Sequence, residues 1–391
     1  MSTNNLVQPH GGKLLPLLIE GEERNEALSR ASTLPQVRLN TKEVSDLIML
    51  GMGALSPLKG FTSREDYQSV LADMRLASGL LWPIPITLAA SKEYAQNIKE
   101  GQDVALIDGE SNDIVGSMTI ETKYFYDRRE EALQVFRTDD SNHPGVAGVF
   151  NQGEVYLGGP VRVFSEAGYP ERFKEFARPS ETRALFSAQG WTTIAAFQTR
   201  NPLHRSHEYL TKVALEVCDG LLIHPIVGKL KADDIPAEVR MECYRILVEK
   251  YYPENRVILK VYPMEMRYAG PREAILHAII RQNFGCSHII IGRDHAGVGD
   301  YYGPYDAQNI FDELKENDLY IRPFKLDSTF YCWKCNSMAS HKTCPHNDES
   351  HLSISGTKLR EMLSRGERPP EQFSRPEVVD ILLKYYKERK S

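Results

Sequence analysis

The sequence predicts a multidomain α/β protein in three parts. Short apolar runs separated by turn residues predict a strand-rich, barrel-like domain over residues 1–170. Strands that alternate with helices predict a Rossmann-like domain with a parallel sheet over residues 171–328. A cluster of cysteines and histidines predicts a small metal-stabilised domain over residues 329–391. A length of 391 residues fits two or three domains at about 150 residues each.

The first part is expected to be a β-barrel or a sandwich because its apolar runs are short and regularly interrupted. Turn signals such as Asp108-Gly109 and Gly158-Gly159-Pro160 separate the runs, and residues 170–179 have the composition of a linker. The expected strands cover residues 82–88, 104–107 and 153–164, and the expected helices cover residues 41–50 and 63–71.

The second part alternates strands and helices, which predicts a parallel sheet with crossover helices. In such sheets the ligand crevice lies at the carboxyl ends of the strands, here directly after Phe197 and Ile291. Strands are expected over residues 191–197, 221–227, 257–262 and, as the final buried strand, 288–291. Helices are expected over 206–218, 236–250 and 271–284, and further along over 357–363, capped by Ser353 or Ser355, and 376–390.

A polar loop follows the first of these strands. Gln198, Arg200 and Asn201 come directly after the apolar run, and Pro202 disfavours helix at Asn201. His204 and His207 are three residues apart, so they share a face in the first turn of the next helix. A helix N-terminus with imidazole donors suits phosphate oxygens, although solvated surface or part of a metal site would also fit two such histidines.

A glycine-rich turn follows the strand at residues 288–291. It reads Gly292-Arg293-Asp294-His295-Ala296-Gly297-Val298-Gly299, which matches neither GxGxxG nor Walker A. Glycines permit a close approach of backbone to ligand, and three polar side chains stand beside them. The two loops are expected to lie next to each other at the edge of the sheet.

Together these loops carry a resemblance to a known family. The segments QTRNPLHRSHE (198–208) and GRDHAGVGDYYGPYDAQ (292–308) resemble the ATP sulfurylases, and further matches cover residues 53–67, 266–297 and 354–363. The resemblance implies a PUA-like barrel followed by a nucleotidyltransferase domain. It implies that sulfate joins the α-phosphate of ATP, with Mg²⁺ on the triphosphate, to give adenylyl sulfate and pyrophosphate. Because no Walker A sequence occurs, no fused adenylyl-sulfate kinase domain is expected.

The resemblance also implies a role for each loop residue. Sulfate would be held by Gln198, Arg200 and the backbone N–H of Ala296. His204 and His207 would bind the β- and γ-phosphates and stabilise the leaving pyrophosphate. The residues implied to be catalytic are Thr199, Arg200, Asn201, His204 and His207, and these, with Gln198, Gly292, Arg293, Asp294 and His295, would bind the nucleotide.

The cysteines fall into two groups. Cys332 and Cys335 form a Cys-x₂-Cys pair, followed by Cys344 and His346, and this Cys₃His set predicts a structural zinc site. His341 and His351 are alternative fourth ligands, and a redox CxxC pair is the alternative reading of the first two cysteines. The remaining cysteines, Cys218, Cys243 and Cys286, stand singly in apolar surroundings and are expected to be buried thiols.

Composition excludes several other classes of protein. The chain has 47 basic and 53 acidic side chains and a net charge of −6, so neither nucleic acid nor an anionic membrane is an expected partner. Because it has neither an apolar run long enough to span a bilayer nor a signal peptide, the cytoplasm is expected. The resemblance favours a homodimer or larger homo-oligomer. The alternatives are an adenylyltransferase with another acceptor and a zinc-ribbon binding protein.

Overall fold

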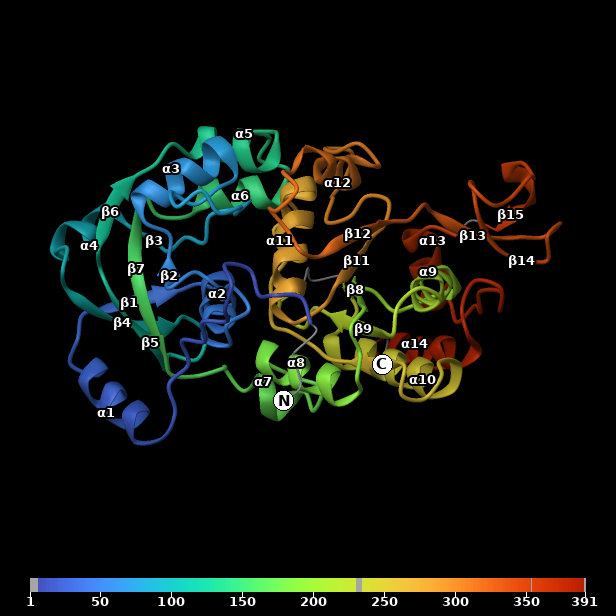
Figure 1. The fold of residues 1–391 in the computed structure, drawn as a ribbon, viewed down its shortest axis with the longest axis horizontal. Helices are drawn as coiled ribbons and strands as arrows, with labels where there is room; N and C mark the ends of the chain where they lie inside the picture. Colours follow the sequence, from blue (N-terminus) through green and yellow to red (C-terminus); the bar gives the residue numbers. More distant parts are fainter. Residues whose placement is uncertain (1–5, 230–233, 353, 390–391) are drawn as a thin grey trace.

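The computed structural model describes residues 6–229, 234–352 and 354–389. Three sheets follow one another along an elongated molecule (Figure 1). A seven-stranded sheet lies at one end, a five-stranded sheet lies in the middle, and a three-stranded sheet lies at the other end.

The seven-stranded sheet is organised around its longest strand, β7 (Val155–Val163), which pairs antiparallel with four others. Gly159 lets β7 bend at this crowded position, because its φ is +152° and an added Cβ would lie 2.1 Å from the Thr119 carbonyl oxygen. The other strands are β1 (Gln36–Leu39), β2 (Gly60–Phe61), β3 (Ala89–Ala90), β4 (Asp103–Asp108), β5 (Ile114–Thr119) and β6 (Thr122–Phe125).

Helices cover this sheet and connect its strands. The best defined is α2 (Thr41–Gly51), where the side chains of Asn40 and Glu43 form a capping box. The prediction of helices over residues 41–50 and 63–71 is therefore confirmed. The others are α1 (Gly21–Ala31), α3 (Arg64–Asp73), α4 (Lys92–Asn97), α5 (Arg128–Phe136) and α6 (Pro144–Asn151).

The expected strand over residues 82–88 is wrong. These residues are buried, but they form an irregular segment in which the Ile86 carbonyl accepts from the Thr62 N–H and the Leu88 carbonyl accepts from the Leu157 N–H. Pro83 and Pro85 lack the N–H groups that a ladder needs, so burial alone produced the strand-like apolar pattern. The strands over 104–107 and 153–164 are confirmed as β4 and β7.

The five-stranded sheet is parallel throughout, as predicted, with the order β10-β9-β8-β11-β12. The chain moves outward from β8 to β10 and then returns to β11 on the other side of β8, which makes a topological switch point between β8 and β11. The strands are β8 (Ile194–Thr199), β9 (Gly220–Pro225), β10 (Val257–Leu259), β11 (His288–Ile291) and β12 (Arg322–Lys325). The crossover helices are α9 (Arg205–Leu215), α10 (Ala237–Tyr251) and α11 (Gly270–Asn283).

Two sequence predictions differ from this architecture. Residues 288–291 are not the final strand, because β12 pairs parallel with β11 over four residues. Arg322, Pro323 and Lys325 occupy three of the four positions of β12, so this edge strand has no apolar run. The expected linker over residues 170–179 overlaps α7 (Tyr169–Arg172) and the start of α8 (Pro179–Ala188), and its Phe173 is fully buried.

The C-terminal helices pack on the body of the molecule. Leu363 of α13 (Gly356–Ser364) and Leu382 of α14 (Pro376–Glu388) lie in the same apolar core as Leu247 of α10. Ser355 caps α13 by accepting from the Lys358 N–H, whereas Ser353 and Lys390 lie outside the described residues.

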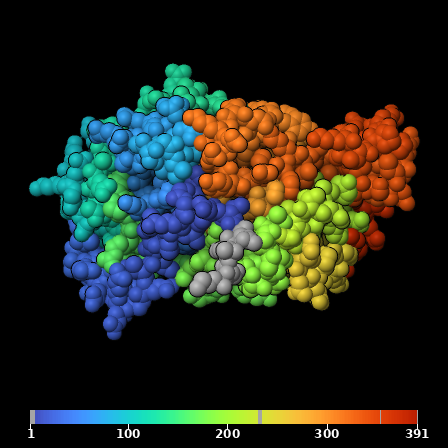
Figure 2. Space-filling view, viewed as in Figure 1, coloured from blue at the N-terminus to red at the C-terminus, as the bar shows by residue number. Residues whose placement is uncertain are grey.

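The three-stranded sheet projects beyond this body, at the red-orange end of Figure 2. It consists of β13 (Thr329–Cys332), β14 (Ser337–Ser340) and β15 (His351–Leu352). The remaining short helices are α12 (Asp306–Asn309), η1 (Ile310–Glu313) and η2 (Asp348–Ser350). Within the described part of the chain, no helix is long and apolar enough to cross a membrane.

Candidate active site and metal centre

A cavity opens at the switch point of the parallel sheet, as the strand order predicts. Its volume is about 380 Å³, and its walls come from the loops after β8, β11 and β12 and from the start of α9. We refer to it as the switch-point cavity. The predicted site residues in its lining are Gln198, Thr199, Arg200, Asn201, His207, Gly292, Arg293, Asp294, His295 and Ala296.

Arg200 lines this cavity and carries one unpartnered donor. Its Nη1 is buried and has no hydrogen-bond partner among the described residues. The guanidinium carbon lies 4.9 Å from the ring centroid of Tyr268, which fixes the plane of the side chain by a cation–π contact. A buried guanidinium N–H without an acceptor is costly, so this position fits an anionic ligand with planar or tetrahedral oxygens.

Gln198 reaches the same cavity with its amide oriented by buried neighbours. The hydroxyl of Tyr262 donates to Gln198 Oε1 over 2.9 Å, and Arg281 Nη2 donates to that hydroxyl over 2.6 Å. Because Oε1 accepts that bond, the remaining polar groups of the amide are the two N–H donors on Nε2, which lies 3.8 Å from Met266 Sδ and 3.3 Å from His277 Nε2. The residue therefore presents donors to whatever lies beside it.

Two histidines continue this network, of which His277 is buried and His295 is half-buried. Gln198 Nε2 lies 3.3 Å from His277 Nε2, and His277 Nδ1 lies 3.1 Å from His295 Nε2. If the amide donates to His277, its Nδ1–H donates to His295, which then carries its own proton on Nδ1. Glu273 Oε1, 3.4 Å from His277 Nε2, competes with the amide for that nitrogen. Burial lowers the pKa of both histidines, so both rings are neutral at pH 7.

The two histidines of the HxxH segment occupy different positions. His207 Nδ1 accepts from the backbone N–H of His204 over 3.2 Å, so the proton of its neutral ring is on Nε2. His204 is the N-cap residue of α9 and lies beside the lining, where its Nδ1 is 3.1 Å from Ser374 Oγ and its ring packs on Phe373. Burial, with electrostatic repulsion from His207 as the smaller cause, lowers the pKa of His204 to about 3. Burial lowers the pKa of His207 to about 4.

The glycine-rich loop after β11 holds an unusual backbone. Asp294 and Ala296 both have left-handed φ values, 59° and 57°. The Asp294 N–H donates to the Pro304 carbonyl over 2.8 Å, and the Ala296 carbonyl accepts from the Gly270 N–H over 3.1 Å. These bonds over-determine a strained conformation, which is typical of ligand-binding loops.

Comparison with known proteins agrees with this arrangement. Residues 174–385 match the ATP-sulfurylase family model and residues 7–166 match the PUA-like domain model. The sulfate adenylyltransferase of Desulforamulus reducens is 57% identical over 382 residues, covering 97% of this chain and 98% of that protein. That of Chlorobium chlorochromatii is 57% identical over 385 residues, covering 98% and 95%.

The chain belongs to the ATP-sulfurylase family. Among solved structures, the hexameric APS kinase from Thiobacillus denitrificans has a TM-score of 0.75 and 27% sequence identity. The match covers 97% of this chain and 68% of that one. The family match explains why residues from two distant loops meet in one cavity.

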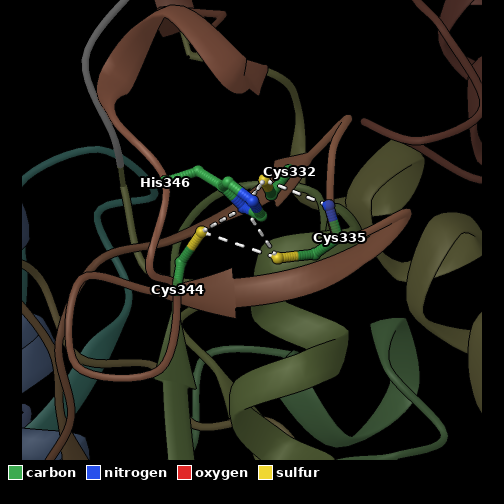
Figure 3. A group of neighbouring side chains, drawn as sticks. All are labelled: Cys332, Cys335, Cys344 and His346. Atoms are coloured by element: carbon green, nitrogen blue, oxygen red, sulfur yellow. Dashed lines mark hydrogen bonds between the residues drawn. The ribbon is translucent and has the colours of Figure 1, made fainter.

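The cysteine cluster, which comprises Cys332, Cys335, Cys344 and His346, lies away from this cavity in the projecting sheet (Figure 3). His346 Nδ1 is 3.4, 3.2 and 3.7 Å from the three sulfurs in that order, and Cys335 Sγ is 3.7 Å from Cys344 Sγ. Zn–S bonds of about 2.3 Å in a tetrahedron place sulfurs roughly 3.8 Å apart, so the donor set fits a zinc-sized ion. The Cys335 N–H also donates to Cys332 Sγ over 3.4 Å, as thiolate ligands require.

The other predicted cysteines and histidines lie outside the cysteine cluster. Cys218, Cys243 and Cys286 are buried free thiols, as predicted, and burial raises the pKa of each. The alternative ligands His341 and His351 form a separate group with Asp348.

Sequence reasoning missed part of the cavity. Asp327, Ser328 and Thr329 line it from the loop after β12, which was missed with that strand. Met266 lines it as well, whereas Tyr262 and His277 orient residues that do. The signal for the first group was available: a further parallel strand beside β11 must end at the same edge of the sheet.

Proposed function

We propose that this chain is a sulfate adenylyltransferase, with the switch-point cavity as its active site. A sulfate oxygen attacks the α-phosphorus of ATP, and the bond from that phosphorus to the α,β-bridging oxygen breaks. Pyrophosphate leaves with the bridging oxygen and the bonding electron pair, and adenylyl sulfate remains. The observation that carries this proposal concerns Arg200. This side chain lines the switch-point cavity, and its buried Nη1 has no hydrogen-bond partner among the described residues.

Sulfate would bind between Arg200 and Gln198. Both side chains offer N–H donors to the same cavity, and the Ala296 backbone N–H from the opposite loop would complete the site. Sulfate is already ionised at neutral pH, so the attacking atom needs no general base. Positioning and charge stabilisation then supply the rate enhancement.

The neutral imidazoles would act on the triphosphate. His207 Nε2–H is a donor in the cavity, at the N-terminus of α9, where the helix dipole also favours an anion. A donor aimed at the leaving pyrophosphate stabilises the negative charge that develops there. His204, held by Ser374 beside the lining, would reach the phosphates from the side of the C-terminal helices.

Thr199 and Asn201 would shape the loop that carries Arg200. Thr199 Oγ1 donates to the Asn201 carbonyl over 2.9 Å and accepts from the Asn201 N–H over 3.1 Å. Tyr244 donates to the same carbonyl over 2.7 Å. Thr199 is thereby assigned the role of a positioning residue, whereas the side chain of Asn201 remains exposed to the cavity mouth.

The glycine-rich loop would hold the nucleotide. Gly292, Arg293, Asp294 and His295 line the side of the cavity opposite Arg200's loop, and ATP would enter as its Mg²⁺ complex. Arg293 would add positive charge where the triphosphate lies, whereas the Asp294 N–H is already bonded to the Pro304 carbonyl and holds the shape of the loop.

The cysteine cluster would hold a structural zinc ion. Four protein ligands leave no position for substrate, so the ion would tie β13, β14 and the loop after β14 together. We also propose a homo-oligomer, in line with the hexameric assembly of the structural relative from Thiobacillus denitrificans.

The test is the reverse reaction. Purified protein is given adenylyl sulfate, pyrophosphate and Mg²⁺, and ATP is followed by luciferase light. We expect ATP only when both substrates are present, and a loss of at least about a hundredfold in Arg200→Ala, since one lost oxyanion donor has that effect. Arg368→Ala is the matched control, because Arg368 pairs with Asp380 on the surface.

Two outcomes would overturn the proposal. Wild-type activity in a folded Arg200→Ala protein would contradict the assignment of Arg200 to the sulfate site. The second outcome combines two results. The protein forms no ATP from adenylyl sulfate, but it releases pyrophosphate from ATP when nicotinate mononucleotide or phosphopantetheine is added. That result would assign the cavity to another adenylyl acceptor.

A further inference from the structure

A second group of ligating side chains lies beside the cysteine cluster. His341, Asp348 and His351 place one ligand atom each within 4.8 Å of the others. They come from the residue after β14, from η2 and from the start of β15. We call these three residues the histidine–aspartate cluster.

The two ring nitrogens of His351 face different acceptors. Its Nε2 lies 3.5 Å from Cys344 Sγ, and its Nδ1 lies 3.2 Å from Asp348 Oδ1. When Cys344 binds the zinc ion proposed above, its thiolate accepts the His351 Nε2–H, the usual support of a metal ligand. With that bond on Nε2, the Nδ1 atom can offer a lone pair to a metal ion, and the carboxylate beside it offers lone pairs as well. A cation between the two atoms would satisfy both.

His341 completes a set of two imidazoles and one carboxylate. Its Nδ1 lies 4.0 Å from the same Asp348 oxygen. Donor atoms at about 2.1 Å from one metal ion lie roughly 3 to 4 Å apart, so the distances from Asp348 Oδ1 to the two imidazoles already suit a shared ion. The side chains of His341 and Asp348 are 54% and 87% exposed, so both can rotate to close on it.

The position of His351 is fixed in advance. Its side chain is only 6% exposed, and its ring stacks on Phe330 with centroids 3.6 Å apart. The cluster lines a cavity of about 420 Å³. This cavity shares four lining residues with the switch-point cavity: Ser206, Arg293, Ser328 and Thr329. Three protein ligands leave at least one coordination position open, and that position would face this cavity.

We propose that the histidine–aspartate cluster binds a second divalent transition-metal ion, separate from the ion in the cysteine cluster. Two imidazoles and a carboxylate suit Zn²⁺, Co²⁺ or Fe²⁺, whereas Mg²⁺ and Ca²⁺ prefer oxygen ligands alone. The ion would join the residue after β14, η2 and the start of β15, beside the cysteine cluster.

The test counts metal ions in the full-length protein. Metal-free protein is titrated with Co²⁺ alone, bound metal is measured by mass spectrometry after dialysis, and visible spectra are recorded. We expect two ions per chain: one with the intense thiolate bands of the cysteine cluster, and one with the weak bands of nitrogen and oxygen ligands. Asp348→Asn and His341→Ala should each weaken the second ion by at least about tenfold and leave the thiolate bands unchanged.

Glu349→Gln is the matched control, because Glu349 is an exposed carboxylate of the same loop outside the cluster. It should keep two ions. One ion per chain in the wild type, with thiolate bands present, would overturn the second site alone. A single ion that is lost in His351→Ala and kept in His346→Ala would overturn it too, because His351 would then be the fourth ligand of the cysteine cluster. Absence of thiolate bands would instead refute the zinc site itself.

Discussion

Gln198 enters the switch-point cavity with its amide already oriented, because buried neighbours hold its oxygen. Tyr262 and Arg281 form that support, and neither lines the cavity. The sequence could predict Gln198 because polar residues after a buried strand stand out. It could not predict Tyr262, which ends an ordinary strand pattern after β10, a strand that is not a neighbour of β8 in the sheet. The same limit applies to His277, which lies within a helix that is buried on every side.

Tyr262→Phe should raise the KM for sulfate about tenfold and leave the KM for MgATP nearly unchanged. The phenol hydroxyl donates to Gln198 Oε1, and without it the amide can turn its oxygen toward the anion. Steady-state kinetics with each substrate varied in turn would measure the split. Tyr320→Phe, at a tyrosine that is 53% exposed, is the control and should leave both values unchanged. An equal increase in both KM values would mean that Tyr262 supports the fold and does not orient Gln198.

Protonation of His207 gives a second prediction at this scale. Its folded pKa is about 4, whereas the unfolded value is about 6.5. Between these values the unfolded chain takes up a proton that the folded chain does not, so the free energy of unfolding falls as pH falls from 6.5 toward 4. Urea unfolding across this range should show a slope that His207→Asn reduces by up to about 1.4 kcal/mol per pH unit. An unchanged slope would mean that His207 is protonated in the folded protein.

At the scale of elements, the strength of each local pattern decided what could be predicted. The strands β8 and β11 and the crossover helices carry continuous apolar runs or helical spacing, so their existence followed from sequence. Among the described residues, the edge strand β12 pairs with one strand only, β11, and has a polar residue at each end. It therefore has no continuous apolar run. The segment 82–88 has the reverse property, an apolar run whose prolines prevent pairing. Because β12 was not predicted, Asp327 and Thr329 were not included in the predicted site.

The contact between α14 and α9 also lies at this scale, and Arg375 carries it. Arg375 donates two hydrogen bonds to Glu208, over 2.9 and 2.7 Å, and Glu208 is 4% exposed. Arg375→Ala should lower the free energy of unfolding by about 2 kcal/mol, since Lys212 still pairs with the buried carboxylate. It should also lower kcat, because Ser374 next to it holds His204. Arg368→Ala, at an exposed pair, should change stability by less than about 0.5 kcal/mol in the same urea titration.

At the scale of the whole molecule, α11 joins the two large sheets into one unit (Figure 1). Ile275 and Ile279 pack in the core of the seven-stranded sheet, while Ala274 and Ala278 pack against the parallel sheet. A helix buried between two sheets cannot be identified from a one-sided hydrophobic pattern, because both of its faces are apolar. The sequence therefore predicts separate domains more readily than it predicts their shared helix.

Asn283, at the end of α11, tests this coupling. Its Nδ2 donates to the carbonyls of Ala54 and Ser56, and its Oδ1 accepts from the His10 N–H, all within 3.0 Å. Asn283→Ala should lower the free energy of unfolding by about 3 kcal/mol, since three buried backbone groups lose their partners. Calorimetry should still show the two sheets melting together. Asn97→Ala, on the exposed helix α4, is the control. Two separated transitions already in the wild type would contradict a shared core.

The projecting sheet should behave independently of this unit when its metal is removed. Residues 329–352 protrude from the body, and their strands are only two to four residues long. With zinc bound as proposed, so small a sheet would depend on the ion, whereas α13 and α14 keep the apolar core that they share with α10. A chelator strong enough to strip zinc should therefore expose cleavage sites between β13 and β15 long before the body unfolds. Limited proteolysis with mass spectrometry of the fragments would locate the cuts, and Cys332→Ser should give the same fragments without chelator. First cuts elsewhere in the chain would show that the metal ions support the whole molecule rather than its end.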